Sequence, residues 1–329
     1  MEAKTFEMDL SKYTPVGIDI SKLSFDVSLG ESTLRFDNTA SGFKKFARLL
    51  PDNSWCVMES TSTYGYRLAD YLCEHGFRVS IVNPLSVKRF AQSGLIRTKT
   101  DSMDARLIRE YARKARLPIY SPDTVEMVEM RDLSRLLDST IRKRTALKNQ
   151  IEAMQQRTRP SKTALKHAQQ MLRYLAKQIK LIEKEMEDLA KKSCPEAYEK
   201  ALSVNGIGKR TATLLITITR GFTMFEDPKQ LIAYIGTSPR KIESGTSVKP
   251  KVHICKMGMK NVRAALYMCS CSAIRHNRAC RDKYQRLLAK GKAKKVALMA
   301  IVNKLIKQLF ACVSKNEFFD NNYQKSFGF

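Results

Sequence analysis

Three short β-rich runs, VGIDI, SFDVSL and STLRF, follow one another between residues 14 and 36 with little sequence between them. Runs of this length with such short connections predict an antiparallel meander. Helical and strand-like patterns then alternate through the segments SGFKKFARLL, SWCVMES, TYGYRLADYLCEHG, RVSIVNP and 101–114. We expect Ser41 to cap the first of these helices and Gly76 to end the second. The order βββαβαβα predicts an α/β domain.

The rest of the chain has mostly helical patterns. Two prolines within residues 116–127 predict a boundary, and Pro160 should break the long helical region that follows. Beyond that break, apolar residues alternate spacings of three and four, which is typical of a coiled-coil seam. The seam consists of Leu172, Leu175, Ile179, Ile182, Met186 and Leu189. We expect it to join two subunits, with a hairpin packed within its own chain as the alternative.

Four parts are therefore predicted, and the fold class is α/β in the first of them. They are the α/β domain, a helical coiled-coil region, a mostly α-helical domain and a polar tail, over residues 14–117, 125–193, 195–312 and 313–329.

The chain is strongly basic, with 59 Lys and Arg against 32 Asp and Glu and a formal net charge of +27. This excess indicates nucleic acid as the partner, because neutralised phosphates supply most non-specific affinity; a solvated basic surface is the alternative. The N-terminus lacks a signal peptide's apolar core, and no apolar run reaches the roughly 20 residues of a membrane span. The eight cysteines form no C-x-x-C pair. We expect a reduced, cytoplasmic, nucleoid-associated protein with no membrane partner.

Four carboxylates occupy positions that suit a metal-binding role. Asp19 lies within the first strand, and Glu59 ends the apolar run WCVME. Asp101 and Asp104 share a face of the first turn of a helix, where capping and the helix dipole could explain one of them. A divalent-metal site explains all four, because Mg²⁺ takes hard oxygen ligands and phosphate oxygens together. Such ions can clamp the attacking and leaving oxygens of a phosphodiester.

Basic residues flank these acids. Arg97, Lys99, Arg106 and Arg109 stand on both sides of the two aspartates in the sequence. We expect them to hold a polyanion over the acidic centre, because Lys and Arg supply most contacts to phosphate oxygens.

The segment LSVNGIGKRTATLLI, residues 202–216, predicts a helix-hairpin-helix. Its Gly-Ile-Gly turn would let backbone N–H groups at a helix start approach a phosphate, with Lys209 and Arg210 beside it. A plain glycine-bearing turn is the alternative. Because Ser203 stands where a Walker A loop needs glycine, we expect no ATP site.

The segment 231–270 is rich in hydroxyls and lysines. By itself, a serine before glycine is usually a turn residue. A zinc site is a rival interpretation with poor support, because the spacings miss the paired C-x₂₋₄-C pattern. Its ligands would come from His253, Cys255, Cys269, Cys271, His276 and Cys280.

The runs GIDISKLSFDV, MESTSTYGYRLADYLCEHGFRVSIVNP and RTKTDSMDARLIREYA resemble the DEDD transposases of insertion sequences, the IS110 family, and the related Piv-type DNA invertases. The resemblance implies a RuvC-like, ribonuclease-H-type fold for the N-terminal domain. It also implies that Asp19, Glu59, Asp101 and Asp104 bind the catalytic ion, Mg²⁺ or Mn²⁺.

Segment 231–270 resembles the C-terminal domain of the same family, through its AYxG…P…SG pattern. The resemblance implies that Ser244 is the nucleophile and holds a DNA end as a phosphoserine. Ser247, Ser238 and Thr237 are weaker candidates. Contacts to the DNA backbone are expected from nearby cations. These are Lys249, Lys251, Lys256, Lys260 and Arg263.

The function implied by the resemblance is site-specific DNA recombination that excises and inserts a mobile element. Donor DNA, target DNA and a structured guide RNA are the implied partners, and the basic run Arg142, Lys143, Arg144 and Lys148 is compatible with an RNA site. Holding two DNA sites together requires a homo-oligomer, a dimer or a tetramer. The alternatives are a metal-dependent junction nuclease that does not need Ser244, a non-catalytic architectural protein, and a Piv-like invertase.

Overall fold

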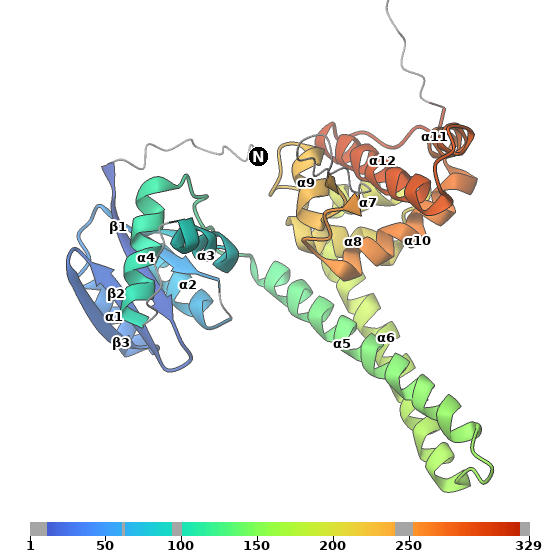
Figure 1. The fold of residues 1–329 in the computed structure, drawn as a ribbon, viewed down its shortest axis with the longest axis horizontal. Coiled ribbons are helices and arrows are strands. Elements are labelled where there is room, and N and C mark those ends of the chain that lie inside the picture. The colour runs from blue at the N-terminus through green and yellow to red at the C-terminus, as the bar shows by residue number, and fades with distance from the viewer. Residues whose placement is uncertain (1–11, 61–62, 94–100, 241–252, 323–329) are drawn as a thin grey trace, which may run out of the picture. The chain divides into compact units, whose positions relative to one another are not determined.

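The computed structural model describes residues 12–60, 63–93, 101–240 and 253–322. The chain forms two compact units that divide between Asp123 and Thr124 (Figure 1).

The first unit is a mixed α/β structure, as the sequence predicts. Its five strands lie in the order β3-β2-β1-β4-β5, with β1, β2 and β3 antiparallel and β1, β4 and β5 parallel. The elements are β1 (Thr14–Ile20), β2 (Ser24–Leu29), β3 (Ser32–Asp37), α1 (Ala40–Ala47), β4 (Ser54–Glu59), the 3₁₀ turn Thr63–Gly65, α2 (Tyr66–Glu74), β5 (Arg78–Val82), α3 (Pro84–Ser93) and α4 (Asp101–Lys114).

Each face of this sheet has its own core, because alternate residues of a strand point to opposite sides. Val16, Ile18 and Ile20 of β1 pack with the aromatic and leucine side chains of α1 and α2. On the other face, Trp55 and Val57 of β4 pack with α3 and α4. The meander, both buried strands and the helix at 101–114 are thus confirmed.

Two local predictions need correction. Thr39, not Ser41, caps α1, and its side chain accepts a hydrogen bond from the backbone N–H of Gly42. Pro84, just after β5, begins α3, a helix that the sequence patterns did not predict. Proline suits this position, since the first helical residue needs no N–H partner. Gly76 follows α2 with φ +81°, as expected of a glycine that ends a helix.

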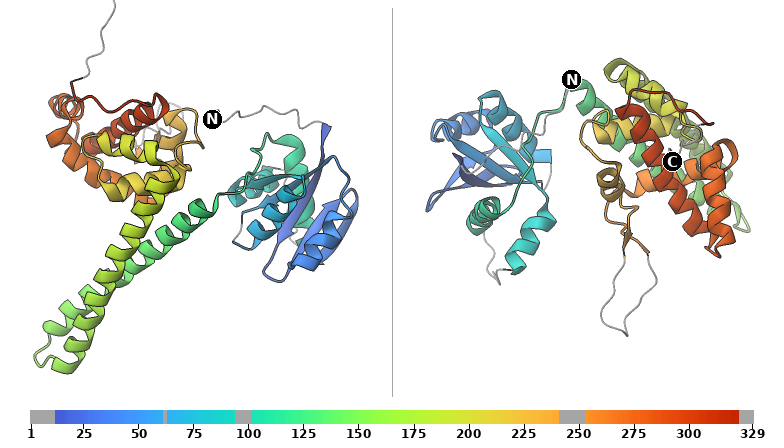
Figure 2. Two further views of the ribbon diagram at one scale, coloured as in Figure 1. Left: turned by 180° about the vertical axis from the view of Figure 1, so that it is seen from behind. Right: turned by 90° about the horizontal axis from the view of Figure 1, so that it is seen from above.

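The second unit begins with two long helices, α5 (Val125–Gln155) and α6 (Lys162–Ser193), which lie side by side as a hairpin (Figure 2). Ser161 caps α6, directly after the predicted break at Pro160. Ile179, Ile182 and Met186 are buried against α5. The expectation that this seam joins two subunits is therefore corrected, because its partner is α5 of the same chain.

The remaining helices form an α-helical bundle. They are α7 (Pro195–Ser203), α8 (Lys209–Thr219), α9 (Pro228–Ile235), α10 (Lys260–His276), α11 (Arg278–Ala289) and α12 (Lys294–Ser314), with a two-stranded ribbon of β6 (Pro239–Arg240) and β7 (His253–Ile254). By length and composition α12 could span a membrane, but its buried residues lie in the centre of this core. Residues after α12 return to the bundle, since the backbone N–H of Phe319 donates to Ser203 Oγ, 2.9 Å away.

Candidate active site

The sheet brings two of the four predicted acids together. Strands β1 and β4 run parallel with Ile18 beside Met58, so Asp19 and Glu59 follow as the next residues on adjacent strands. Ile18 and Ile20 face the core under α1 and α2. Asp19 therefore lies on the opposite face, the one covered by α4.

Helix α4 carries the other two acids and packs unusually close to β1. A Cβ atom on Gly17 would lie 2.0 Å from the carbonyl oxygen of Ala105 and 2.6 Å from the backbone nitrogen of Arg109. Only glycine permits this approach. The helix runs back towards the start of β1, so its first turn, with Asp101 and Asp104, lies towards the strand end that carries Asp19 (Figure 1).

The chemistry of this donor set suits a hard divalent cation. All four predicted ligands offer carboxylate oxygens, which Mg²⁺ and Mn²⁺ prefer. Asp19, Glu59 and Asp104 are each half-buried, which leaves them open to one side. Within the described residues, no three His, Cys, Asp or Glu side chains lie close enough to hold an ion; the side chain of Asp101 falls outside them.

A fifth carboxylate, which the sequence analysis missed, lies on the same face. Asp26 of β2 stands directly opposite Asp19 in the antiparallel register. Asp19 and Asp26 thus place two carboxylates side by side on adjacent strands. The alternation in SFDVSL could have revealed it, because Ser24, Asp26 and Ser28 form one polar row within an otherwise apolar strand.

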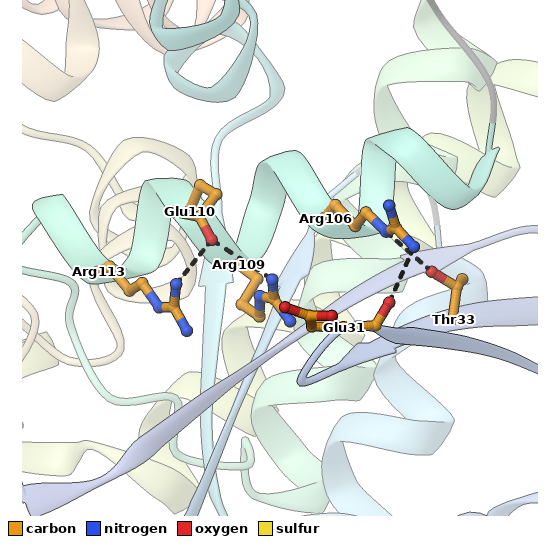
Figure 3. A network of polar contacts seen from close by, with 6 residues as sticks. All are labelled: Glu31, Thr33, Arg106, Arg109, Glu110 and Arg113. Carbon is orange, nitrogen blue, oxygen red and sulfur yellow. Dashed lines mark hydrogen bonds and ion pairs between the residues drawn. The ribbon is translucent and has the colours of Figure 1, made fainter.

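Two of the expected basic residues are engaged within the first unit. Arg106 donates through Nη2 to the carbonyl oxygen of Glu31 at 2.9 Å and through Nε to Thr33 Oγ1 at 3.3 Å (Figure 3). The Arg109 side chain is only 11% exposed and lies 3.5 Å from Glu110. Arg106 thus fastens α4 to the turn between β2 and β3 and to the start of β3, whereas the contact of Arg109 with Glu110 stays within α4. Arg97 and Lys99 lie outside the described residues.

The predicted helix-hairpin-helix is formed by α7, a turn and α8. Gly206 adopts φ +109° and packs against Ala273 of α10, so it serves the packing of the bundle. A Cβ on Gly208 would meet no atom within 4 Å. Lys209 lies 3.1 Å from Glu187 and Arg210 lies 3.3 Å from Glu183, so both cations pair with α6. Their contact with DNA stays a prediction.

The predicted nucleophile lies between the two strands of the small ribbon. Strands β6 and β7 flank the segment 241–252, which contains Ser244 and lies outside the described residues, as do Ser247, Lys249 and Lys251. Thr237 is 1% exposed and its hydroxyl donates to the carbonyl oxygen of Ile232, which leaves it unsuited to attack DNA. Ser238 is half-buried, and its carbonyl oxygen accepts a hydrogen bond from the backbone N–H of Cys255.

The remaining basic candidates begin at β7. Arg263 of α10 donates to the carbonyl oxygen of Ile235 at 2.8 Å and so joins α10 to the end of α9. Lys256 adopts φ +57° in the turn before α10, and Lys260 is the first residue of that helix. Among the rival zinc ligands, Cys269 and Cys280 are buried in the helical core, where burial raises the pKa of Cys280 to about 11. A thiol in that state is a poor metal ligand.

Comparison with known families finds two matches along the chain. Residues 16–160 match a family model described as "Transposase", the model for DEDD transposases of the IS110 group. Residues 198–285 match a model described as "Transposase IS116/IS110/IS902 family". The first match contains all four acids, and the second contains Ser244.

Similar proteins carry related names. The chain is 29% identical over 325 residues to the "Pilin gene-inverting protein" of Moraxella bovis, which covers 93% of this chain and 98% of the relative. It is 26% identical over 286 residues to the "Transposase for insertion sequence element IS1328" of Yersinia enterocolitica, covering 78% and 83%. It is 24% identical over 272 residues to the "Transposase for insertion sequence element IS1111A" of Coxiella burnetii, covering 74% and 73%.

Proposed function

The chain belongs to the IS110 family of transposases, enzymes that act on DNA, and from this premise we propose that it is a site-specific recombinase that excises and inserts a mobile element. The observation that carries the proposal is the placement of Asp19 and Glu59 as neighbouring residues on the parallel strands β1 and β4, on the sheet face that α4 covers. That arrangement supports a RuvC-like, ribonuclease-H-type catalytic domain.

The four acids and Ser244 divide the chemistry between them. Asp19, Glu59, Asp101 and Asp104 would hold Mg²⁺ or Mn²⁺, which polarises the phosphate and neutralises its charge. The Ser244 oxygen forms a bond to phosphorus while the bond from phosphorus to a deoxyribose oxygen breaks. The serine gives up its proton and the leaving oxygen takes one up, so the DNA ends as a phosphoserine and a free hydroxyl. A second DNA hydroxyl reverses the step and joins a new strand.

The partners follow from the proposal. Donor and target DNA are the substrates, and the charge of +27 favours both. The structure contains no recognition helix that we can assign to base reading among its described residues, so a structured RNA that pairs with both DNAs is the proposed source of sequence specificity. The basic run at 142–148 on α5 is its proposed contact.

Strand exchange between two sites requires more than one subunit, and the outer face of the hairpin is the proposed interface. Met171, Tyr174 and Leu181 of α6 are 59%, 63% and 43% exposed and lie at spacings of three and seven. They form an apolar stripe beside the seam already used within the chain.

DNA inversion is the second candidate, because the Moraxella relatives named for pilin gene inversion cover nearly the whole chain. Inversion and transposition share the same cutting and joining chemistry. They differ in whether the two sites lie on one DNA molecule, so the context of the DNA decides between them.

Recombination in cells tests the proposal. The chain is supplied with its native flanking DNA, together with a target plasmid or an invertible segment, and junctions are sequenced. Wild type should give precise junctions, whereas Asp101→Ala and Ser244→Ala should give none. Glu110→Gln is the matched control, because Glu110 lies on the same helix and pairs with Arg113 at 2.9 Å. Recombination by Ser244→Ala would overturn the assignment of the nucleophile.

A further inference from the structure

A second concentration of positive charge lies in the hairpin of α11 and α12. Residues 278–308 contain ten Lys and Arg and a single acid, Asp282. The family match ends at residue 285, so most of this segment lies beyond both matched regions.

Four cations of this hairpin face one another. Lys283 is half-buried on α11, and its ammonium donates to the carbonyl oxygen of Ala300 on α12 at 3.2 Å. Burial lowers the pKa of Lys283, and the nearby charges of Lys304, Lys307 and Arg286 lower it further. We call these four residues the α11–α12 cluster.

The cluster has no compensating charge on its own helices. Helix α12 contains no acid, and the Asp282 side chain is the only one on α11. In the described part of the chain, none of the four cations takes part in an ion pair, although Lys209, Arg210 and Lys191 all do. Lys283 and Lys304 are half-buried, whereas Arg286 and Lys307 are exposed. Like charges held together weaken a fold, most of all where they are partly buried, so this arrangement favours an external anion.

The turn before α12 and the start of that helix carry further cations. Its N-cap residue, Ala293, provides no side-chain hydrogen bond, and Lys294 and Lys295 occupy the first turn. Cations at the positive end of a helix are unfavourable, and uncapped N–H groups need an acceptor. A phosphate would satisfy both requirements. Lys290, Lys292, Lys294 and Lys295 are all exposed.

We propose that the α11–α12 cluster and the adjoining turn form a second nucleic-acid surface, which binds the phosphodiester backbone without reading its bases. Binding of the phosphodiester backbone at this surface takes no part in cutting or joining DNA, so it goes beyond the proposed chemistry.

Binding by the full chain, without divalent metal, tests the inference independently of catalysis. The variant Arg286→Gln/Lys304→Gln/Lys307→Gln keeps Lys283, whose hydrogen bond to α12 is structural. The control is Lys44→Gln/Lys45→Gln/Arg48→Gln, which removes three exposed cations at α1. The probes are a 30-base-pair DNA duplex of arbitrary sequence and an RNA hairpin, each titrated at several salt concentrations.

The cluster variant should bind at least one probe about tenfold more weakly at 0.1 M salt, and its salt slope should fall by about two to three. Weakening with DNA alone identifies a DNA anchor, and weakening with RNA alone identifies an RNA anchor. Its melting temperature should equal or exceed that of wild type, because mutual repulsion is relieved. Unchanged binding of both probes, or a loss no greater than that of the control, would overturn the inference.

Discussion

Gly17 shows how one residue without a side chain sets the geometry of the proposed site. It sits two residues before Asp19 and allows the backbone of α4 to touch the sheet. The proposed site, in which the acids of α4 act together with Asp19, requires this close contact. Gly17 takes no part in the proposed reaction, but it sets the position of the helix that carries two of the proposed ligands.

Gly17→Ala should displace α4, because the new methyl group would meet backbone atoms that cannot rotate away. We expect a loss of about 1–3 kcal/mol in the free energy of unfolding and loss of recombination. Gly65→Ala is the control, since its Cβ would meet only the flexible tips of Ile20 and Met58, at 3.3 and 3.7 Å. Thermal unfolding monitored by circular dichroism checks both variants, and equal stability of the two would contradict this account of the packing.

At the scale of single residues, the sequence predicts which acids are candidate ligands better than it predicts which residues lie beside them. Asp19 and Glu59 are candidates because a carboxylate in or at the end of an apolar strand is unfavourable without a role. Asp101 and Asp104 are candidates because they share a face of one helix turn. Asp26 was missed because strand register, which places it opposite Asp19, becomes visible only in the sheet. Lys209 and Arg210 looked like free cations because their partners on α6 lie more than twenty residues earlier in the chain.

Among the elements, the junction of α6 and α8 depends on one half-buried carboxylate, Glu187. Glu187 lies 2.6 Å from the Lys191 ammonium and 3.1 Å from that of Lys209. The Lys191 ammonium, with support from Lys209, lowers the pKa of Glu187 to about 2, although burial opposes the change. The folded-state pKa lies below its usual 4.5, so this stabilisation is complete above that pH and disappears as pH falls towards 2.

Glu187→Gln should therefore lower the stability of the chain at pH 7 by about 1 kcal/mol, a modest value because both lysines are partly exposed. The difference from wild type should shrink steadily as the pH is lowered from 4.5. Glu185→Gln, which changes an exposed carboxylate of the same helix, should have no measurable effect. Thermal denaturation at a series of pH values provides the comparison, and a difference that persists unchanged at pH 2.5 would refute the ion-pair explanation.

The hairpin shows which part of an element a sequence can predict. Spacings of three and four along α6 identify an apolar seam, and Pro160 with Ser161 locates its start. The spacing of apolar residues does not show which helix packs against the seam, because a helix of the same chain and a helix of another subunit would fit it equally well. The structure assigns Ile179, Ile182 and Met186 to α5, which leaves the outer stripe for assembly.

Met171→Gln/Tyr174→Gln/Leu181→Gln should convert an oligomer into a monomer without unfolding the hairpin, because these side chains are exposed and glutamine favours helices. Val128→Gln/Leu136→Gln is the control, since it removes two exposed apolar side chains of α5. Sedimentation or light scattering gives the mass of each variant. A wild type that is already monomeric at high concentration would contradict the proposed interface.

For the molecule as a whole, the account rests on two units that contribute different groups to one reaction. In the proposed reaction the first unit would supply the carboxylates and the second would supply Ser244. The second unit also carries most of the surplus positive charge. The sequence suggested this division because each unit matches its own family pattern in the expected order. The arrangement of the two units on DNA depends on the nucleic acid and on partner subunits. A sequence pattern within one chain does not specify that arrangement.

The most direct test of this division is the detection of a covalent link between the purified chain and DNA. Labelled DNA carrying an element end is incubated with protein and Mg²⁺ and then separated under denaturing conditions. Wild type and Glu110→Gln should give a protein-linked DNA band, and Ser244→Ala and Asp101→Asn should give none. If wild type or Ser244→Ala instead cuts the DNA with no linked band, the serine is not the nucleophile and the chain acts as a metal-dependent nuclease.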